Sequence, residues 1–212
     1  METDRPVAVE FYSRAAAEVA RDLLGTCLVS TVGGDDKVCA GVVVETEAYG
    51  GPEDPASHAA TATGITDRNR AMYGPPGRAY VYRSYGVHWC LNVVTGRDGQ
   101  GEAVLLRGLL PVHGLDVMLE RRGRRPLAEG PGRLARAMGV TDALYGHDLR
   151  YPPLVVLPGW RVASEDVGVS GRVGIKIAAD WPHRFYVRGF PGVSGPRRMR
   201  PAADGATVNP TP

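Results

Sequence analysis

The sequence has few cysteines and contains neither of the common metal-binding motifs. Its three cysteines, Cys27, Cys39 and Cys90, are an odd number without close pairing, which argues against a disulfide framework. No CxxC pattern and no HExxH pattern occurs in the chain, so no sequence signal supports a metal site. We therefore expect a protein that works without a bound metal or other cofactor.

Lysine is almost absent from the chain. It occurs only at Lys37 and Lys176, so nearly all of the 25 basic residues are arginines. We attribute this imbalance to codon bias in a GC-rich genome, but its chemical consequence does not depend on the cause. Arginine stays protonated and cannot serve as an amine nucleophile. Schiff-base chemistry would therefore need one of the two lysines or the N-terminal amine.

Long apolar runs are also missing. No stretch approaches the roughly 18 residues needed to span a bilayer, and Met1–Pro6 lacks the basic and apolar regions of a signal peptide. Of the 212 residues, 43% are hydrophobic and 23% are charged, proportions near those of globular domains. The net charge of +2 permits nucleic-acid binding without requiring it. We expect a cytoplasmic protein without membrane contact, and a monomer because no coiled-coil pattern appears.

Apolar spacing and turn residues predict a fold of mixed helices and strands. The predicted helices are Glu10–Leu24 with Ser13 as its N-cap, Gly114–Arg122, Pro131–Met138 and a short segment near Asp67–Tyr73. The predicted strands are Cys27–Val32, Val38–Tyr49, Ala79–Ser84, His88–Val94, Ala103–Leu110, Leu154–Leu157, Gly174–Ile177 and Arg184–Arg188. Strands joined by short turns favour an α+β fold with a mainly antiparallel sheet. We expect one domain over residues 1–195, followed by a basic, flexible tail over residues 196–212.

Two glutamates alternate along the predicted strand Val38–Tyr49. Glu45 and Glu47 point to one face and Thr46 to the other. Two carboxylates beside a hydrophobic run are costly to desolvate unless they are paired or used. From this fragment alone, two interpretations remain open: an exposed strand face with two solvated glutamates, or a general base whose pKa is tuned by burial.

A tyrosine occupies the predicted tip of the second hairpin. Tyr80 and Tyr82 share one face of this hairpin, whereas Tyr85 falls in the turn, where Gly86 accepts a positive φ. An aromatic core hairpin is the plain interpretation. A large ring at a tight turn does not easily reach a core, however, and an exposed aromatic wedge flanked by arginines is suited to pushing between stacked bases.

Two further segments carry candidate functional arginines. Arg107 ends an apolar run, so it needs a partner, either in a structural ion pair or as a group that orients a carboxylate or water in a site. In the stretch Glu129–Arg133, glycines precede a predicted helix and could present backbone N–H groups to a phosphate, with Arg133 adding charge. This stretch lacks the GxxxxGK[ST] pattern of a P-loop, so alone it is a weak signal.

Several of these segments together carry a family resemblance. The stretches ETEAYGGPEDPASHA, TDRNRAMYGPPGRAYVYRSYGVHWCLNVV, EAVLLRGLLPVHGLD and EGPGRLARAMG occur in this order, and RVGI and RFYVRG follow them. The chain resembles the alkyladenine (3-methyladenine) DNA glycosylase family, of the bacterial type, over roughly Val9 to Val193. The resemblance implies a single compact domain around a curved antiparallel sheet. It also implies excision of damaged purines from double-stranded DNA by hydrolysis of the N-glycosidic bond, with base flipping and without strand cleavage.

The resemblance implies roles for individual residues in the chemistry. Glu47 falls where the family places the general base that activates water, and Arg107 matches the arginine that helps to hold this water. Tyr85 matches the tyrosine that enters the minor groove in place of the flipped nucleotide.

It also implies a pocket for the flipped base. Tyr49 and His58 match the pair on one side of the base, and Tyr82 matches the tyrosine on the other side. Asn92 matches the asparagine that crowds the position of the exocyclic amine of guanine. Stacking between such rings is expected to contribute roughly 1–3 kcal/mol per base.

Some segments depart from the family pattern or fit it loosely. The loop after His58, AATATGITD, lacks the extra basic residue expected for a phosphate contact. Val87 and His88 follow the wedge, so their contacts with DNA are expected to differ. Together with Arg133, they are candidate DNA-contacting residues.

Two other functions remain open at the level of the sequence. A nucleoside or sugar hydrolase could use Glu45 and Glu47 as a carboxylate pair, but this leaves Tyr85 without a role. A catalytically inactive module could bind damaged DNA without releasing the base, with salt-dependent affinity. The presence of both Glu47 and Arg107 argues against that module.

Overall fold

The computed structural model describes residues 5–194, in which helices and strands combine in an α+β fold. Its eight strands are β1 (Cys27–Ser30), β2 (Cys39–Tyr49), β3 (Ala79–Ser84), β4 (His88–Thr95), β5 (Glu102–His113), β6 (Leu154–Leu157), β7 (Val167–Ser170) and β8 (Arg184–Val187). Its α-helices are α1 (Val9–Tyr12), α2 (Ala16–Asp22), α3 (Leu115–Arg122) and α4 (Pro131–Ala137). Five 3₁₀ turns complete the elements: η1 (Asp35–Lys37), η2 (Gly51–Glu53), η3 (Arg70–Tyr73), η4 (Asp142–Leu144) and η5 (Ser164–Asp166).

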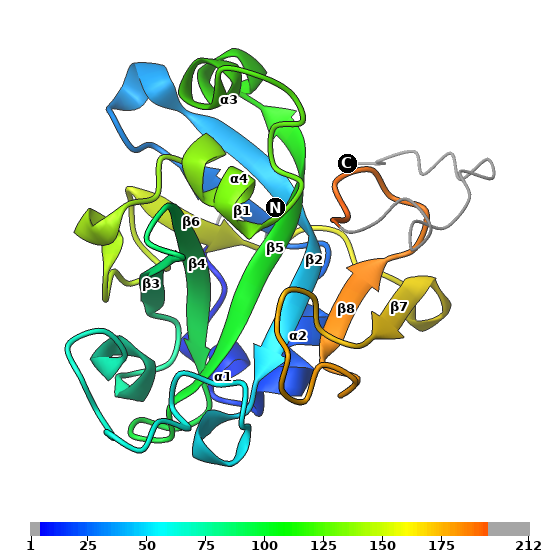
Figure 1. Cartoon of the computed structure of the whole chain (residues 1–212). Helices are drawn as coiled ribbons and strands as arrows, with labels where there is room; N and C mark the ends of the chain where they lie inside the picture. Colours follow the sequence, from blue (N-terminus) through cyan, green and yellow to red (C-terminus); the bar gives the residue numbers. More distant parts are fainter. Residues whose placement is uncertain (1–4, 195–212) are drawn as a thin grey trace.

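All strand pairs in the sheet are antiparallel, as the sequence predicts. The main path runs β3-β4-β5-β2-β1-β6 (Figure 1). The first half of β2 pairs with β1, and its second half, from Glu45 to Glu47, pairs with β8, which in turn pairs with β7. Strand β2 is therefore paired on both sides along most of its length and lies deep inside the domain.

The two faces of the sheet bury different side chains. Thr46 donates a hydrogen bond from its hydroxyl to the carbonyl of Ala20 on α2, at 2.7 Å, so α2 covers the face opposite to Glu45 and Glu47. In Figure 1, α1 and α2 lie behind the sheet. The main hydrophobic core forms between the sheet and helices α2 and α4.

A smaller hydrophobic cluster lies beneath the segment that links β2 to β3. It contains Ala59 and Met72 from that segment, together with Tyr80, Val94 and Ala103 from strands β3, β4 and β5. The linking segment is thereby packed onto the sheet, although it contains only 3₁₀ turns and loops.

The predicted helix over Glu10–Leu24 is wrong in its middle. Helix α1 ends before Ser13, whose hydroxyl donates to the carbonyl of Val9 at 2.9 Å, so Ser13 ends a helix and does not cap the start of one. The second helix starts after Ala15. The backbone N–H of Ala16, in its first turn, donates to a carboxylate oxygen of Glu102 on β5 at 2.8 Å. This partner is 86 residues away in the chain, so no local pattern could reveal it.

The predicted strand over Gly174–Ile177 is also wrong. This stretch is a loop in which Gly174 has a φ of +85°, outside the range of a strand. The strand β7, which lies just before it, has only four residues and was not predicted. The other predicted helices and strands are confirmed to within three residues at either end, although the short helical segment is a 3₁₀ turn.

The expected tail over residues 196–212 lies outside the described residues. Within the described range, every helix falls short of the length and apolar character that crossing a membrane requires.

Candidate active site

An irregularity between β2 and β5 brings the candidate catalytic residues together. Glu45 is opposite Gly108 and Thr46 is opposite Leu106, so Arg107 has no partner in the strand register. A bulge of this kind redirects a side chain. It points the guanidinium of Arg107 toward the face of the sheet that carries Glu45 and Glu47.

Arg107 contacts both glutamates inside the protein. Its Nε donates to Glu45 Oε1 and its Nη1 donates to Glu47 Oε2, each at 3.2 Å. Neither glutamate has any solvent-exposed surface, and Arg107 is buried as well. The alternative of an exposed strand face with two solvated glutamates is therefore wrong.

Glu45 is held by more partners than Glu47. Besides Arg107, it accepts hydrogen bonds from Nε of Arg184 at 2.7 Å, from the hydroxyl of Ser194 at 2.9 Å, and from the backbone N–H of Ser194. Two guanidinium groups thus compensate its charge, and its oxygens are occupied by protein donors. We infer that Glu45 anchors β8 and the segment around Ser194, and that it lacks the free oxygen that a second member of a carboxylate pair would need.

Glu47 has a different set of partners. Its Oε1 accepts from the backbone N–H of Val173 at 2.7 Å, and its Oε2 accepts from the hydroxyl of Tyr49 at 3.0 Å. The carbonyl of Val173 in turn accepts from Nη1 of Arg107 at 3.3 Å. A carboxylate, a guanidinium and a backbone carbonyl therefore converge within one small region.

The electrostatics of this region raise the pKa of Glu47, as expected of a general base. Burial raises the pKa of Glu47, and the nearby Arg107 and the Val173 N–H oppose this only in part. Burial alone would lower the pKa of Arg107, but Glu47 and Glu45 outweigh that effect and raise it. Arg107 is therefore a fixed positive charge, whereas Glu47 binds a proton more readily than a solvated glutamate does.

We expect the variant Glu47→Gln to be more stable than the wild type at pH 7. Because the pKa of Glu47 is raised on folding, the folded state holds the proton more tightly, and stability falls as the pH rises from the ordinary value of 4.5 through the raised value. A neutral glutamine avoids this loss. The Tm of the variant at pH 7 should therefore exceed that of the wild type, and each kcal/mol of gain corresponds to about 2–4 °C in a domain of this size.

Calorimetry at several pH values tests this expectation, and Glu45→Gln provides the contrast. The gain of Glu47→Gln should disappear as the pH falls below about 4.5, because the wild-type side chain is then protonated too. Glu45→Gln should instead lower the Tm, because it leaves two buried guanidiniums short of charge compensation. A large loss of stability in Glu47→Gln at pH 7 would contradict the account.

The four residues expected to form a base pocket all line one narrow cavity. Its volume is about 70 Å³, and its wall contains Tyr49, Ala56, His58, Met72, Tyr80, Tyr82, Asn92, Ala103 and Ile175. Tyr49 links this cavity to Glu47 through its hydrogen bond. Tyr80, Ala56 and Ile175 were not among the predicted site residues, although Tyr80 shares a hairpin face with Tyr82.

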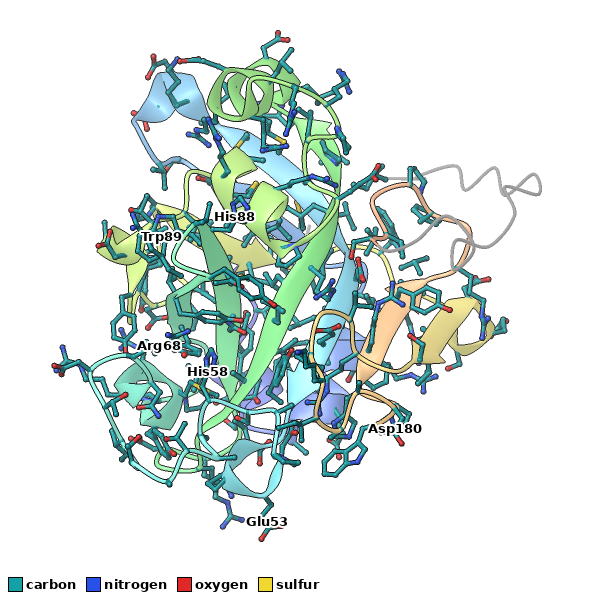
Figure 2. The ribbon with its side chains drawn as sticks, viewed as in Figure 1. Glu53, His58, Arg68, His88, Trp89 and Asp180 are labelled. Carbon is teal, nitrogen blue, oxygen red and sulfur yellow. The ribbon has the colours of Figure 1, made fainter. Side chains whose placement is uncertain are left out.

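The cavity walls are fixed by hydrogen bonds and ring contacts. Nδ1 of His58 and the hydroxyl of Tyr80 share a hydrogen bond of 2.7 Å, and the rings of His58 and Tyr82 meet edge to face at 4.5 Å. Burial, with a contribution from Arg68, lowers the pKa of His58 to about 4, so its ring is neutral at pH 7. The amide nitrogen of Asn92 donates to the carbonyl of Tyr80 at 3.0 Å. Figure 2 shows His58 in front of the sheet near Arg68.

Tyr85 projects into solvent at the tip of the β3–β4 hairpin. It is 89% exposed, and both Tyr85 and Gly86 have a positive φ, of 51° and 69°. Such a pair of angles is typical of tight hairpin turns, but it is costly for a tyrosine. The next residue, Val87, is also exposed. The interpretation of an aromatic core hairpin therefore holds for Tyr80, which is buried, and Tyr82, which packs against the same cluster, but not for Tyr85.

A basic groove lies beside this tip. It has a volume of about 800 Å³, and its lining includes the candidate contact residues Tyr85, Val87, His88, Arg107 and Arg133. It also includes further arginines that were not predicted, Arg121, Arg122, Arg124 and Arg136. The sequence signal for them was the run RRGRR at residues 121–125. Figure 2 shows His88 and Trp89 at the start of β4.

The arginines in this groove differ in how far their guanidinium groups are used in hydrogen bonds within the protein. Arg121 is used for structure, because it donates to the carbonyls of Val32, Lys37 and Ala137. Burial and the charges of Arg133, Arg136 and Arg124 lower the pKa of Arg122. Such mutual repulsion indicates a surface suited to a polyanion.

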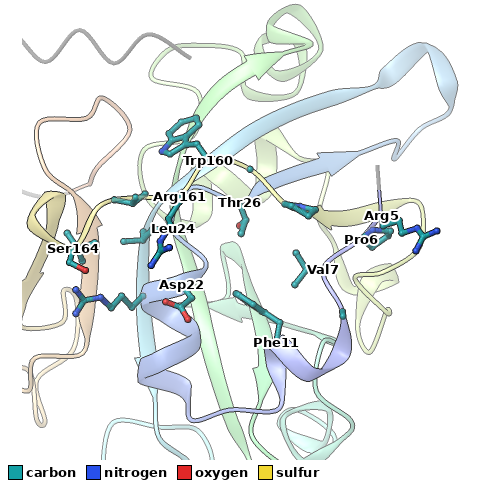
Figure 3. Close-up of a pocket in the computed structure, with 16 residues that line it drawn as sticks. Arg5, Pro6, Val7, Phe11, Asp22, Leu24, Thr26, Trp160, Arg161 and Ser164 are labelled. Atoms are coloured by element: carbon teal, nitrogen blue, oxygen red, sulfur yellow. The ribbon is translucent and has the colours of Figure 1, made fainter. Parts of the chain in front are cut away.

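A larger cavity, of about 1150 Å³, lies away from this site (Figure 3). It is lined by residues of α1 and α2, among them Phe11 and Asp22, and by the segment around Trp160 and Arg161. None of the residues discussed above lines it. Because α2 covers the sheet face opposite to Glu47, this cavity opens away from the candidate site.

Comparisons with known proteins agree on one family. The sequence profile of the family described as methylpurine-DNA glycosylase matches residues 10–191. A protein from Rhodopseudomonas palustris (strain HaA2), named "Putative 3-methyladenine DNA glycosylase", is 46% identical over 90% of this chain and 91% of its own length. Proteins of the same name from Methanoculleus marisnigri and Frankia casuarinae are 49% and 47% identical, over 87% and 92% of this chain and 96% and 95% of their own lengths.

Proposed function

The chain belongs to the methylpurine-DNA glycosylase family, and from this premise we propose that it flips damaged purines, alkylated or deaminated, out of duplex DNA and hydrolyses their N-glycosidic bond with a water activated by Glu47. One observation carries the proposal. The buried carboxylate of Glu47 is bonded to Arg107 and, through Tyr49, is connected to an aromatic cavity.

The proposed reaction begins with extrusion of the nucleotide. Chemistry at C1′ of a stacked nucleotide requires it to leave the duplex, which costs a few kcal/mol and least for a damaged base. Tyr85 is exposed at the tip of the hairpin, so its ring is available to fill the gap and offset part of this cost.

The flipped base would then stack in the cavity between Tyr82 on one side and Tyr49 and His58 on the other, which requires the contacting rings of Tyr82 and His58, 4.5 Å apart, to separate as the base enters. A purine alkylated at N3 or N7 is cationic, and the neutral ring of His58 does not repel it. Asn92 is held against the wall by its bond to the carbonyl of Tyr80, so it cannot easily turn away from the exocyclic amine of a guanine. This clash would discriminate against undamaged guanine.

The chemical step assigns one task to each group around the water. Glu47 accepts a proton as the water attacks C1′, a role typically worth about 10²–10⁴-fold in rate. Arg107 donates a hydrogen bond to the water, and the carbonyl of Val173 can accept a hydrogen bond from its second O–H, as both groups lie next to Glu47. A cationic alkylated purine leaves as a neutral base without further protonation, whereas a neutral deaminated purine must gain one proton as it leaves; in both cases the products are the free base and an abasic site.

We propose that the enzyme is monofunctional, with no cofactor. A strand-cleaving glycosylase attacks C1′ with an amine, and neither lysine of the chain lines the cavity. Lys37 is paired with Glu120 at 2.7 Å. We also propose that the protein acts as a monomer, in the cytoplasm, on the DNA of the nucleoid.

The basic groove beside Tyr85 is the proposed surface for the DNA backbone. We expect Arg124→Ala to weaken binding equally for damaged and undamaged duplexes, because a phosphate contact carries no sequence information. The slope of log K against log salt should become shallower by about 1. Titrations at several salt concentrations measure both effects.

Arg161→Ala is the matched control for this prediction. Arg161 is exposed in the cavity on the opposite face of the sheet, so removing it changes the net charge by the same amount without touching the groove. An equal loss of affinity in both variants would mean that net charge alone, and not the groove, determines DNA binding.

Base release from defined substrates tests the proposed function. The substrates are two duplexes, one containing hypoxanthine and one containing 7-methylguanine, and free deoxyinosine. Release from either duplex, with little or none from the nucleoside, is expected. Preference for the free nucleoside would identify a nucleoside hydrolase instead. Specific binding to both duplexes without release would identify a damage-binding module.

A further inference from the structure

Arg172 is a buried arginine that none of the proposed chemical steps uses. It lies in the loop between β7 and β8 and is only 4% exposed. Its guanidinium forms a two-pronged ion pair with the carboxylate of Asp54, with Nη2 donating to Oδ1 at 2.9 Å and Nη1 donating to Oδ2. The two residues are 118 positions apart in the chain.

The two terminal nitrogens of the same guanidinium have further partners, whereas its buried Nε has no hydrogen-bond partner among the described residues. Nη1 donates to the carbonyl of Ala48 at 3.0 Å, and Nη2 donates to the carbonyl of Ala178 at 3.2 Å. The guanidinium carbon lies 4.8 Å from the ring centre of Tyr49 and 5.8 Å from that of Trp181. A planar guanidinium can satisfy all of these partners at once, whereas a lysine ammonium cannot.

The loop that contains Arg172 supplies three parts of the candidate site. The N–H of Val173 donates to Glu47, and the carbonyl of Val173 accepts from Arg107. The side chain of Ile175 forms part of the cavity wall. Ala178 in this loop has a φ of 47°, an unfavourable angle for a residue other than glycine, and its carbonyl is held by Arg172.

Asp54 organises the opposite wall of the cavity. Its carboxylate accepts from the backbone N–H of Gly50 at 3.2 Å and of Ala56 at 3.1 Å. Ala56 and His58, just beyond it, line the cavity. The Asp54–Arg172 pair therefore ties together the two loops that enclose the cavity from opposite ends of the sequence.

We propose that Arg172, together with Asp54, is a positioning residue that sets the Val173 backbone against Glu47 and Arg107 and the ring of Tyr49 against the flipped base. This inference rests on the proposed function. Arg172 would touch neither the base nor the water, and it would act through Val173 and Tyr49.

The test uses Arg172→Lys. This variant keeps the buried positive charge but loses the two parallel N–H donors that pair with the carboxylate of Asp54. We expect single-turnover base release from a 7-methylguanine duplex to fall at least tenfold at saturating enzyme, with a smaller change in Kd. The acidic limb of the pH–rate profile should also move to higher pH, because the Val173 N–H lowers the pKa of Glu47 and is displaced in the variant.

Other groups also influence the titration of Glu47, and the variant keeps the identity of each of them. Arg107 and Tyr49 contact it directly, and Glu45 lies next to it on β2. Tyr82 on β3 and Cys90 on β4 face it from the neighbouring strands. None of these five side chains is replaced by the substitution, so a shifted limb would report displacement of the Val173 backbone or of the Tyr49 ring, the two groups that Arg172 positions.

The chain provides a control for the geometry of the ion pair in Arg150, which is more exposed than Arg172. This residue forms a similar fork with Asp148, at 2.9 and 2.7 Å, and lies 5.8 Å from the ring centre of Tyr151, away from the cavity. Arg150→Lys should leave the rate and the pH profile unchanged. Asp54→Asn should resemble Arg172→Lys, and the double variant should be no worse than the more severe single one.

Amide hydrogen exchange separates this inference from the proposed function. The Val173 amide should be protected in the wild type, less protected in Arg172→Lys and unchanged in Arg150→Lys, whether or not the protein releases a base. If the wild-type protein released no base, the proposed function would be overturned. Wild-type rates, pH profile and Val173 protection in a folded Arg172→Lys variant would overturn the positioning role.

Discussion

Glu47→Gln is expected to bind a lesion-containing duplex as tightly as the wild type and to release the base about 10²–10⁴-fold more slowly. Glutamine keeps the size of the side chain. Its single amide oxygen can accept from the backbone N–H of Val173, and its amide nitrogen can donate to the hydroxyl of Tyr49. It cannot take a proton from water. The substitution therefore removes the proposed chemical step and leaves the base cavity and the basic groove intact.

Single-turnover kinetics with saturating enzyme, together with equilibrium binding to the same duplex, measure the two parts of this prediction. Glu18→Gln is the matched control, because Glu18 is exposed on α2, the helix that covers the opposite face of the sheet. It should behave as the wild type in both assays. A Glu47→Gln variant with full activity would mean that another group activates the water.

Tyr85→Ala is expected to weaken lesion binding and slow base release without affecting the fold. The tyrosine ring is exposed and packs against nothing in the core, whereas in the proposed complex it fills the gap left by the flipped nucleotide. Stacking of this kind is worth about 1–3 kcal/mol, so the expected loss is about 5- to 150-fold. Fluorescence of 2-aminopurine placed next to the lesion would report the reduced extent of flipping.

Tyr151→Ala controls for the loss of an exposed tyrosine. Tyr151 is 59% exposed and is not part of the groove lining, so its removal should leave flipping unchanged. Unaltered flipping in Tyr85→Ala would show that the hairpin tip is not the wedge. Lower thermal stability in Tyr85→Ala would show that the ring has a packing role that its exposure does not suggest.

Much of the arrangement of the site could be predicted from local sequence patterns. Strand alternation places Glu45 and Glu47 on one face, and the turn at Gly86 places Tyr85 at a hairpin tip, as the structure has them. Side chains of alternating positions on a strand share a face whatever packs against it. The antiparallel sheet follows from the same hairpins.

The burial of the two glutamates could not be predicted from that strand alone. It depends on Arg107 from β5, on Arg184 from β8 and on Ser194 beyond it, which approach from as far as 149 residues away. Gly108 allows this approach, because a Cβ there would lie 2.3 Å from the carbonyl oxygen of Gly192. These long-range partners leave no periodic signal in the sequence.

The loop that carries Arg172 shows the same limitation more clearly. Its apolar residues led to a predicted strand over Gly174–Ile177, but the backbone of Val173 bonds to Glu47 and Arg107 in place of a neighbouring strand. Nothing near Arg172 in the sequence indicates its pairing with Asp54. Where a backbone is held by side chains from distant segments, local propensity is a poor guide.

The product analysis of one reaction tests the central claim most directly. A labelled duplex containing 7-methylguanine is incubated with the protein, and the free base, the intact strand and the cleaved strand are quantified before and after alkali. The account predicts free base in an amount equal to the alkali-labile sites, and an uncut strand before alkali. No base release, or strand cleavage before alkali with a covalent adduct trapped by borohydride, would contradict hydrolysis by a water activated at Glu47.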